Sequence, residues 1–184
     1  MAFKDNILTF SSTKIVEDAT GTEVMMDWER EIMEKSAEYI CESKGDILEI
    51  GFGMGICADY IQAQGVNSHT IIEIHPQIIE RLNAWASGKS NVTIIEGDWN
   101  SVSGLSTYDG IFLDTFRDDN RSNFKSFVDS KLKSGGKVTY WNDDLDINSE
   151  FNFSNISFEQ IAITPDANSY RYYDEIYYLP KVVG

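Results

Sequence analysis

Three glycines alternate with larger residues after a short apolar run, in the segment Leu48-Glu49-Ile50-Gly51-Phe52-Gly53-Met54-Gly55. Glycine is needed where a backbone turns sharply and passes close to a ligand. The apolar run at residues 46–50 is typical of a strand, and residues 53–64 have helical periodicity. Free N–H groups and the positive dipole end at the start of that helix favour a carboxylate. This arrangement predicts a loop that binds a nucleotide-type ligand.

An acidic residue, Glu73, follows about twenty residues beyond the glycines, near the end of a second predicted strand. A carboxylate at this position can accept hydrogen bonds from both hydroxyls of a ribose. Asp98 and Trp99 follow the third predicted strand, where Asp98 could bind an adenine amino group and Trp99 could cover the ring. The alternatives are an ordinary exposed Glu, a capping Asp and a core Trp.

These residues favour S-adenosyl-L-methionine over a dinucleotide as the ligand. The turn has the spacing G-x-G-x-G, whereas the dinucleotide-binding motif is G-x-G-x-x-G. Nothing in the second half of the chain is typical of a dehydrogenase catalytic domain, and 184 residues leave little room for one.

The remaining pattern predicts the elements that must position these residues. Helices are expected at residues 24–42, 53–64, 76–87 and 120–132, and strands at 46–50, 69–74, 92–96, 108–114, 137–141, 156–163 and 171–179. Strands that alternate with helices imply right-handed crossovers and a parallel sheet. The last two strands, around a turn at residues 165–168, predict an antiparallel hairpin. The expected fold class is α/β, with a Rossmann-like class I methyltransferase sheet, a C-terminal antiparallel hairpin and an N-terminal helical lid.

Length and composition favour one globular domain over residues 1–184. Within it we expect an N-terminal arm at residues 1–22, a lid helix at 23–43 and a Rossmann-like core at 44–184. The net charge of −15, with no basic patch, argues against a nucleic-acid partner and would suit a cationic substrate, although a solvated acidic surface is the simpler explanation. Cys41 and Cys57 are too few and wrongly spaced for a zinc site, so no metal is expected.

Without a signal region or spanning segment, the sequence predicts no membrane contact and a cytoplasmic location.

Six segments, taken together and in this order, resemble the guanidinoacetate N-methyltransferase family, which includes the fungal-type protein arginine N-methyltransferase. They are Val24–Glu29, Leu48–Gly55, Ile71–Glu73, Gly97–Trp99, Tyr108–Thr115 and Gly135–Tyr140, and the ending Tyr170–Tyr173 is similar to the family's last hairpin. The resemblance implies a methyltransferase that uses S-adenosyl-L-methionine to methylate the guanidino group of a small molecule, guanidinoacetate-like or arginine-like.

The resemblance also implies residue roles. The residues that it assigns to the cofactor are Met25, Gly51, Gly53, Met54, Glu73, Asp98 and Trp99. Residues within or directly after the same segments that we expect beside them are Phe52, Gly55, Ile56, Ile74, His75 and Asp114. Glu29 and Asp114 would bind the guanidino group as the catalytic pair.

Two carboxylates suit this chemistry. A guanidinium presents five N–H donors in a planar fork and is almost always protonated, which makes it a poor nucleophile. Glu29 and Asp114 could bind the fork bidentately, and one of them could accept the proton that leaves. Asp114 ends the fourth predicted strand and would face the cleft, while Glu29 would lie on the lid helix. The alternatives are a turn cap for Asp114 and an exposed helix residue for Glu29.

The segment after Tyr140 departs from the family. Guanidinoacetate enzymes have an Asn and then Leu-Thr, which hold the substrate carboxylate, whereas this chain has Asn142, Asp143 and Asp144. If these three residues contact the substrate, the two acids would repel a carboxylate. An alkylguanidine, arginine bound through its ammonium group, or a protein arginine would then fit better. The alternative is that both Asp side chains point to solvent.

Two other functions stay open. A protein arginine N-methyltransferase is one. A non-catalytic S-adenosylmethionine-binding protein is the other, because the stretch between Trp141 and Ile156 leaves little room for the usual crossover helix.

Overall fold

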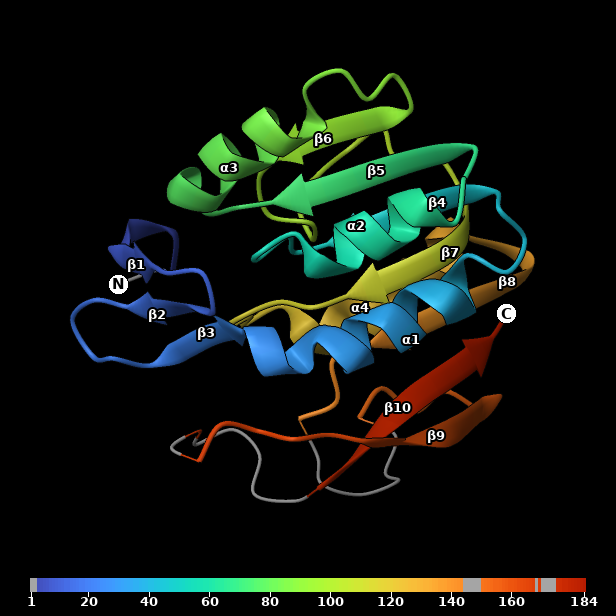
Figure 1. Cartoon of the computed structure of the whole chain (residues 1–184). Coiled ribbons are helices and arrows are strands. Elements are labelled where there is room, and N and C mark those ends of the chain that lie inside the picture. The colour runs from blue at the N-terminus through green and yellow to red at the C-terminus, as the bar shows by residue number, and fades with distance from the viewer. Residues whose placement is uncertain (1–2, 144–149, 168, 170–174) are drawn as a thin grey trace.

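A seven-stranded sheet forms the centre of the computed structural model, which describes residues 3–143, 150–167, 169 and 175–184 (Figure 1). The strand order is β6-β5-β4-β7-β8-β10-β9. The bounds are β4 Asp46–Ile50, β5 Ser68–Glu73, β6 Val92–Glu96, β7 Tyr108–Leu113, β8 Leu132–Tyr140, β9 Ile156–Ala162 and β10 Ile176–Val183. The first five of these strands are parallel, and β10 pairs antiparallel with both β8 and β9. The predicted α/β sheet with a C-terminal antiparallel hairpin is confirmed.

The register of the parallel strands brings their carboxyl ends to one edge. Ile50 at the end of β4 pairs with Ile72 of β5 and with Leu113 of β7. All three side chains are buried, as expected for parallel strands that are covered on both faces. The residues that follow these strands therefore emerge side by side.

Helices cover both faces of the sheet. Helices α1 (Arg30–Ile40), α2 (Ile56–Ala63) and α3 (Pro76–Ala86) pack on one face, and α4 (Phe124–Lys131) packs on the other. On the α4 face, Phe151 and Phe153 complete the core against Phe124 and Tyr140. Of the stretch between Trp141 and Ile156, the structure describes residues 142–143 and 150–155, and these form no helix; the expectation on the crossover concerns residues 144–149 as well, which lie outside the described residues.

The N-terminal region differs from the prediction. Helix α1 begins at Arg30 and not near residue 24, because Glu23–Met26 form strand β3, followed by the short 3-10 helix η2 (Asp27–Glu29). Strand β3 pairs with β2 (Lys14–Glu17), which pairs with β1 (Leu8–Phe10), in a separate antiparallel sheet. All four residues of β3 are buried, so burial on both faces outweighs the helical periodicity of this stretch.

This small sheet lies beyond the carboxyl ends of the parallel strands, where the arrowheads of β5 and β7 point (Figure 1). It is preceded by the 3-10 helix η1 (Phe3–Asp5), and Gln77 of α3 exchanges two hydrogen bonds with the backbone of Leu8. Residues 3–22 of the expected arm therefore form a folded cover over this edge. Helix α1 is not a lid as expected, because it packs on a face of the sheet against α2, β7 and β8.

Other boundaries shift for local reasons. The helix expected from residue 53 begins at Ile56, since Gly53 and Gly55 both have positive φ. The helix expected from residue 120 begins with the 3-10 helix η3 (Arg121–Asn123), and β8 begins five residues before the predicted start at residue 137. Residues 171–174 of the last predicted strand lie outside the described residues. In the described part of the chain, no helix is long and apolar enough to cross a membrane.

A buried acid–imidazole pair joins β4 to β5. His69 Nε2 lies 2.8 Å from Glu49 Oε2, and His69 Nδ1 lies 3.2 Å from the amide nitrogen of Gln62. Burial raises the pKa of Glu49 more than the hydrogen bond from His69 lowers it. A carboxyl group with a raised pKa stabilises the fold below its ordinary pKa of 4.5, and that stabilisation is lost as pH rises through the raised value.

We predict that Glu49→Gln becomes progressively more stable than the wild type as the pH is raised from 4.5. The amide oxygen can still accept the His69 N–H, while the buried charge is removed. Urea unfolding of both proteins across this range measures the difference, in which the contribution of other shared carboxyl groups largely cancels. If the difference in unfolding free energy between the two proteins did not change with pH, the raised pKa of Glu49 would be contradicted.

Candidate active site

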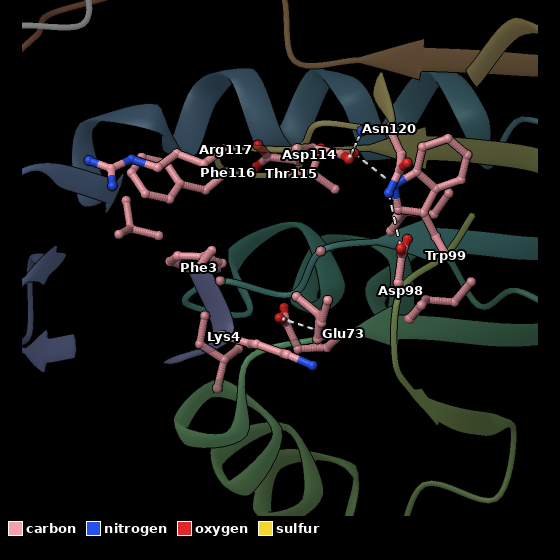
Figure 2. Close-up of a pocket in the computed structure, with 18 of the residues that line it drawn as sticks. Phe3, Lys4, Glu73, Asp98, Trp99, Asp114, Thr115, Phe116, Arg117 and Asn120 are labelled. Atoms are coloured by element: carbon pink, nitrogen blue, oxygen red, sulfur yellow. Dashed lines mark hydrogen bonds between the residues drawn. The ribbon is translucent and has the colours of Figure 1, made fainter. Parts of the chain in front are cut away.

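A cavity of about 350 Å³ lies at the carboxyl edge of the parallel strands (Figure 2). This volume is within the usual range of small-molecule sites, roughly 300–1,000 Å³. The predicted cofactor residues that line it are Met25, Gly51, Gly53, Glu73, Ile74, Asp98, Trp99 and Asp114. They come from β3 and from the exits of β4, β5, β6 and β7, which the sheet register brings to one edge.

The glycine turn approaches its neighbours too closely for any side chain. Gly51 has a φ of 92°, and a Cβ atom there would lie 1.9 Å from the carbonyl oxygen of Asp114. A Cβ atom on Gly53 would lie 2.4 Å from Met25 Sδ, the same sulfur that accepts the backbone N–H of Met54 at 3.0 Å. The turn is therefore in van der Waals contact with Met25 on one side and with the exit of β7 on the other.

Glu73 holds this turn through its carboxylate. Its Oε2 accepts the backbone N–H of Phe52 at 2.9 Å, and its Oε1 accepts those of Ile74 and His75, each at 2.8 Å. Burial raises the pKa of Glu73 despite these three bonds, which act to lower it. A carboxylate has about four lone-pair positions, and three of those of Glu73 accept backbone N–H groups. Glu73 can therefore accept a hydrogen bond from one ribose hydroxyl, where we expected two.

Asp98 and Trp99 connect the loops after β6 and β7. Trp99 Nε1 donates to Asp118 at 2.7 Å, and Asp98 Oδ2 accepts from the amide of Asn120 at 3.0 Å (Figure 2). The Trp99 ring packs edge-on against Phe127 at 5.2 Å. Trp99 is thus both a core residue and part of the cavity wall, so the two interpretations of this residue are compatible.

Several lining residues were missed by the sequence prediction. The segment Thr115–Asn120 forms one wall, and Phe3 and Lys4 of η1 reach the cavity from the N-terminal cover. Phe3 lies 5.0 Å from the Phe116 ring and 4.9 Å from the His75 ring. A polar run directly after a parallel strand is a signal that could have identified Thr115–Asn120. No local pattern indicates Phe3 and Lys4, because a separate sheet places them.

Other expected cofactor residues support the cavity from behind. Phe52 packs on Trp85, Ile56 is in the core, and Gly55 is the N-cap of α2. His75 is buried and caps α3 by accepting the Gln77 N–H, and its Nε2 lies 3.0 Å from the carbonyl oxygen of Asn6. These four, like Met54, are outside the cavity lining as the structure describes it.

The residues expected to contact the substrate are more dispersed. Glu29 is buried next to β3, does not line the cavity, and accepts the backbone N–H of Met26 at 3.2 Å. Asn142 is buried and donates to the carbonyl oxygen of Tyr178. Asp143 has a side chain that is 67% exposed and accepts from Trp141 Nε1 at 3.0 Å, as the solvent-facing alternative predicted. Asp144 lies outside the described residues.

Three features meet at this cavity. They are the turn that requires glycine at position 51, the Glu73 carboxylate that holds the turn, and Asp114 at the end of the neighbouring strand β7. Residues 1–145 match the family model described as guanidinoacetate N-methyltransferase. The chain belongs to this family of S-adenosylmethionine-dependent N-methyltransferases. In the described residues there is no group of three or more His, Cys, Asp or Glu side chains arranged to hold a metal ion.

Several curated relatives share the name protein arginine N-methyltransferase 2. The protein arginine N-methyltransferase 2 of Aspergillus oryzae is 36% identical over 152 residues, which cover 76% of this chain and 36% of that protein. The protein of the same name from Candida glabrata is 39% identical over 127 residues, which cover 59% of this chain and 31% of that one. The chain spans about a third of the length of the curated relatives it matches.

Solved structures support the fold. Spermidine synthase from Thermotoga maritima gives a TM-score of 0.66 at 11% identity, covering 96% of this chain and 72% of that one. The N-methyltransferase NodS from Bradyrhizobium japonicum gives 0.64 at 17% identity, covering 85% and 96%. At these identities the likeness concerns the fold alone.

The cavity residues fit S-adenosylmethionine. Gly51 and Gly53 line the cavity where the cofactor's amino-acid end would lie, and Glu73 retains an acceptor position for a ribose hydroxyl. Among the lining residues, the acids Glu73, Asp98, Asp114, Asp118 and Asp119 outnumber the cations Lys4 and Arg117. An acidic cavity favours a ligand with a positive sulfonium centre.

We predict that Gly51→Ala lowers the affinity for S-adenosylmethionine by at least about tenfold, since the added carbon must displace the Asp114 backbone. Gly65→Ala is the matched control. Gly65 also has positive φ, at 71°, but its added carbon would meet nothing within 4 Å. It should lose only about 1–2 kcal/mol of stability to the backbone conformation and keep its cofactor affinity. Calorimetry and urea unfolding measure both effects, and equal cofactor affinity in the two variants would contradict this account of the turn.

Proposed function

We propose that this chain transfers a methyl group from S-adenosylmethionine to a nitrogen of a guanidino group. The observation that carries the proposal is the position of Asp114. It follows β7 at the carboxyl edge of the sheet, lines the cofactor cavity and contacts Gly51 of the turn through its backbone. A carboxylate at this position would lie beside S-adenosylmethionine bound at the glycine turn.

Methylation of a protonated guanidino group requires a group that binds the cation and accepts its proton, and a carboxylate can do both. S-adenosylmethionine supplies an electrophilic methyl group on a positively charged sulfur. Asp114 would hold the guanidinium through parallel N–H bonds, fix one nitrogen in line with that methyl group and accept the departing proton. Such alignment can account for about 7–11 kcal/mol of barrier lowering. Glu29 is buried beside β3 and does not line the cavity, so it is proposed as the second carboxylate on the family resemblance alone.

A small guanidine is the proposed acceptor. Asp143 and Asp144 would repel an acceptor with a carboxylate only if their side chains faced it. Asp143 instead accepts from Trp141, and its Oδ2 lies 3.9 Å from an Arg121 nitrogen. This pairing reduces the expected repulsion, so guanidinoacetate-like and arginine-like acceptors both belong in the proposal.

Protein arginine is a second candidate acceptor, favoured by the name that the curated relatives share. The two candidates separate in one experiment. Incubation with methyl-labelled S-adenosylmethionine, a cell extract and its low-mass fraction should place most label in low-mass product if a small guanidine is the acceptor. Label recovered mainly in protein arginine would replace the first candidate with the second.

We predict that Asp114→Asn, which keeps the shape and removes the charge, lowers kcat/KM for guanidines by about 10²–10⁴-fold. Mass spectrometry of a panel of guanidines and amines measures turnover, and calorimetry measures cofactor affinity. Asp129→Asn is the control, because that carboxylate lies exposed on α4, paired with Lys125. Unchanged turnover of every guanidine in Asp114→Asn would refute the proposal. Tight cofactor binding with no transfer by the wild type would point to a non-catalytic binding protein.

A further inference from the structure

Arg121 is a cation that is almost enclosed at the acidic edge of the sheet. It directly follows the cavity wall Thr115–Asn120, and its side chain is only 12% exposed. Its Nε and Nη2 donate to the two carboxylate oxygens of Glu150, at 2.7 and 3.0 Å, and its Cζ lies 5.3 Å from the Phe151 ring centroid. A bidentate pair of this kind fixes the orientation of both side chains.

The same guanidinium holds the exit of β8. Its Nη2 also donates to the carbonyl oxygen of Trp141, the first residue after that strand. On its other side, the Trp141 N–H donates to the carbonyl oxygen of Leu113 at 2.8 Å. The Trp141 residue is therefore held between Arg121 and the residue that precedes Asp114. Arg121 thus connects the cavity wall, the β8 exit and the segment at Glu150.

Electrostatics keep this side chain charged. Burial alone would lower the pKa of Arg121. The hydrogen bond to Glu150 and the negative charges of Glu150, Asp143 and Asp114 outweigh burial, so the pKa of Arg121 is raised above its ordinary value. Its Nη1 is buried with no hydrogen-bond partner among the described residues. A buried cation with incomplete hydrogen bonding is costly, which argues for a role besides stability.

We propose that Arg121 is a positioning residue for the methyl acceptor. It would fix the β8 exit against the β7 exit, and so hold the direction in which Asp114 meets the guanidinium. The inference rests on the proposed function for its kinetic consequence, but the fixing of Trp141 can be measured without activity. Arg121 itself is not proposed to touch the acceptor or the cofactor.

The test compares Arg121→Met and Arg121→Lys with Lys125→Met. Lys125 is the matched control, because it is a cation of α4 that pairs with Asp129 and lies 5.8 Å from the Phe153 ring centroid. Hydrogen exchange follows the Trp141 amide, with the amides of residues 51–56 as an internal reference. Kinetics use guanidinoacetate and L-arginine as acceptors, and calorimetry gives the affinity for S-adenosylmethionine.

We expect Arg121→Met to accelerate exchange of the Trp141 amide, to raise the acceptor KM about tenfold and to lower kcat up to about 100-fold. Cofactor affinity should stay within about twofold, since Gly51 and Glu73 lie on other strand exits. Arg121→Lys, which keeps the charge but not the planar fork, should be intermediate, and Lys125→Met should behave as wild type.

Two results would overturn the proposal. If the Trp141 amide exchanges at the wild-type rate in Arg121→Met, the proposal is overturned, whatever the activity of the variant. Parallel losses of cofactor affinity and acceptor kinetics would show a general structural role. If the wild type methylates neither acceptor nor protein arginine, the proposed function fails. In that case faster exchange still establishes that Arg121 fixes Trp141, but the acceptor role is overturned with the function.

Discussion

The backbone contact between Gly51 and Asp114 is the constraint on which the site depends. Only glycine can occupy position 51, because a Cβ atom would lie 1.9 Å from the Asp114 carbonyl oxygen, and the Asp114 N–H donates to Ile50 at 2.8 Å. The turn that receives the cofactor and the carboxylate that would receive the acceptor thus share one contact. This contact holds the backbones of the turn and of the β7 exit together, which keeps a binding loop and the residue that carries the reacting group close to the positions that transfer chemistry requires.

Strand register extends this contact across the sheet. Because Ile50 pairs with both Ile72 and Leu113, the residues that follow these strands begin at the same level. Glu73 then braces the turn from the β5 side, and Trp141 continues the row from the β8 side through its bond to Leu113. The 3-10 helix η1, which precedes the N-terminal sheet, closes the row through the contact of Phe3 with Phe116. The cavity is therefore built from neighbouring strand exits and one added cover.

The sheet and half of the site could be predicted because both follow from local patterns. Gly51, Glu73 and Asp114 each come directly after an apolar run, and the ends of parallel strands meet at one edge. The N-terminal sheet could not be predicted, since Glu23–Met26 have helical periodicity and become a strand only by pairing with β2. Arg121 lacks a local signal for the same reason. Its partners Trp141 and Glu150 are distant in sequence and meet only in the folded chain.

Under the proposed function, the β7 exit presents a guanidino nitrogen to the methyl group of S-adenosylmethionine. Nuclear magnetic resonance of the product formed from S-adenosylmethionine carrying a ¹³C-methyl group identifies the acceptor atom that receives this group. We expect a single new ¹³C-methyl signal, bonded to a guanidino nitrogen of guanidinoacetate or arginine. A label on an amino, carboxylate or hydroxyl group of the same acceptors would contradict it.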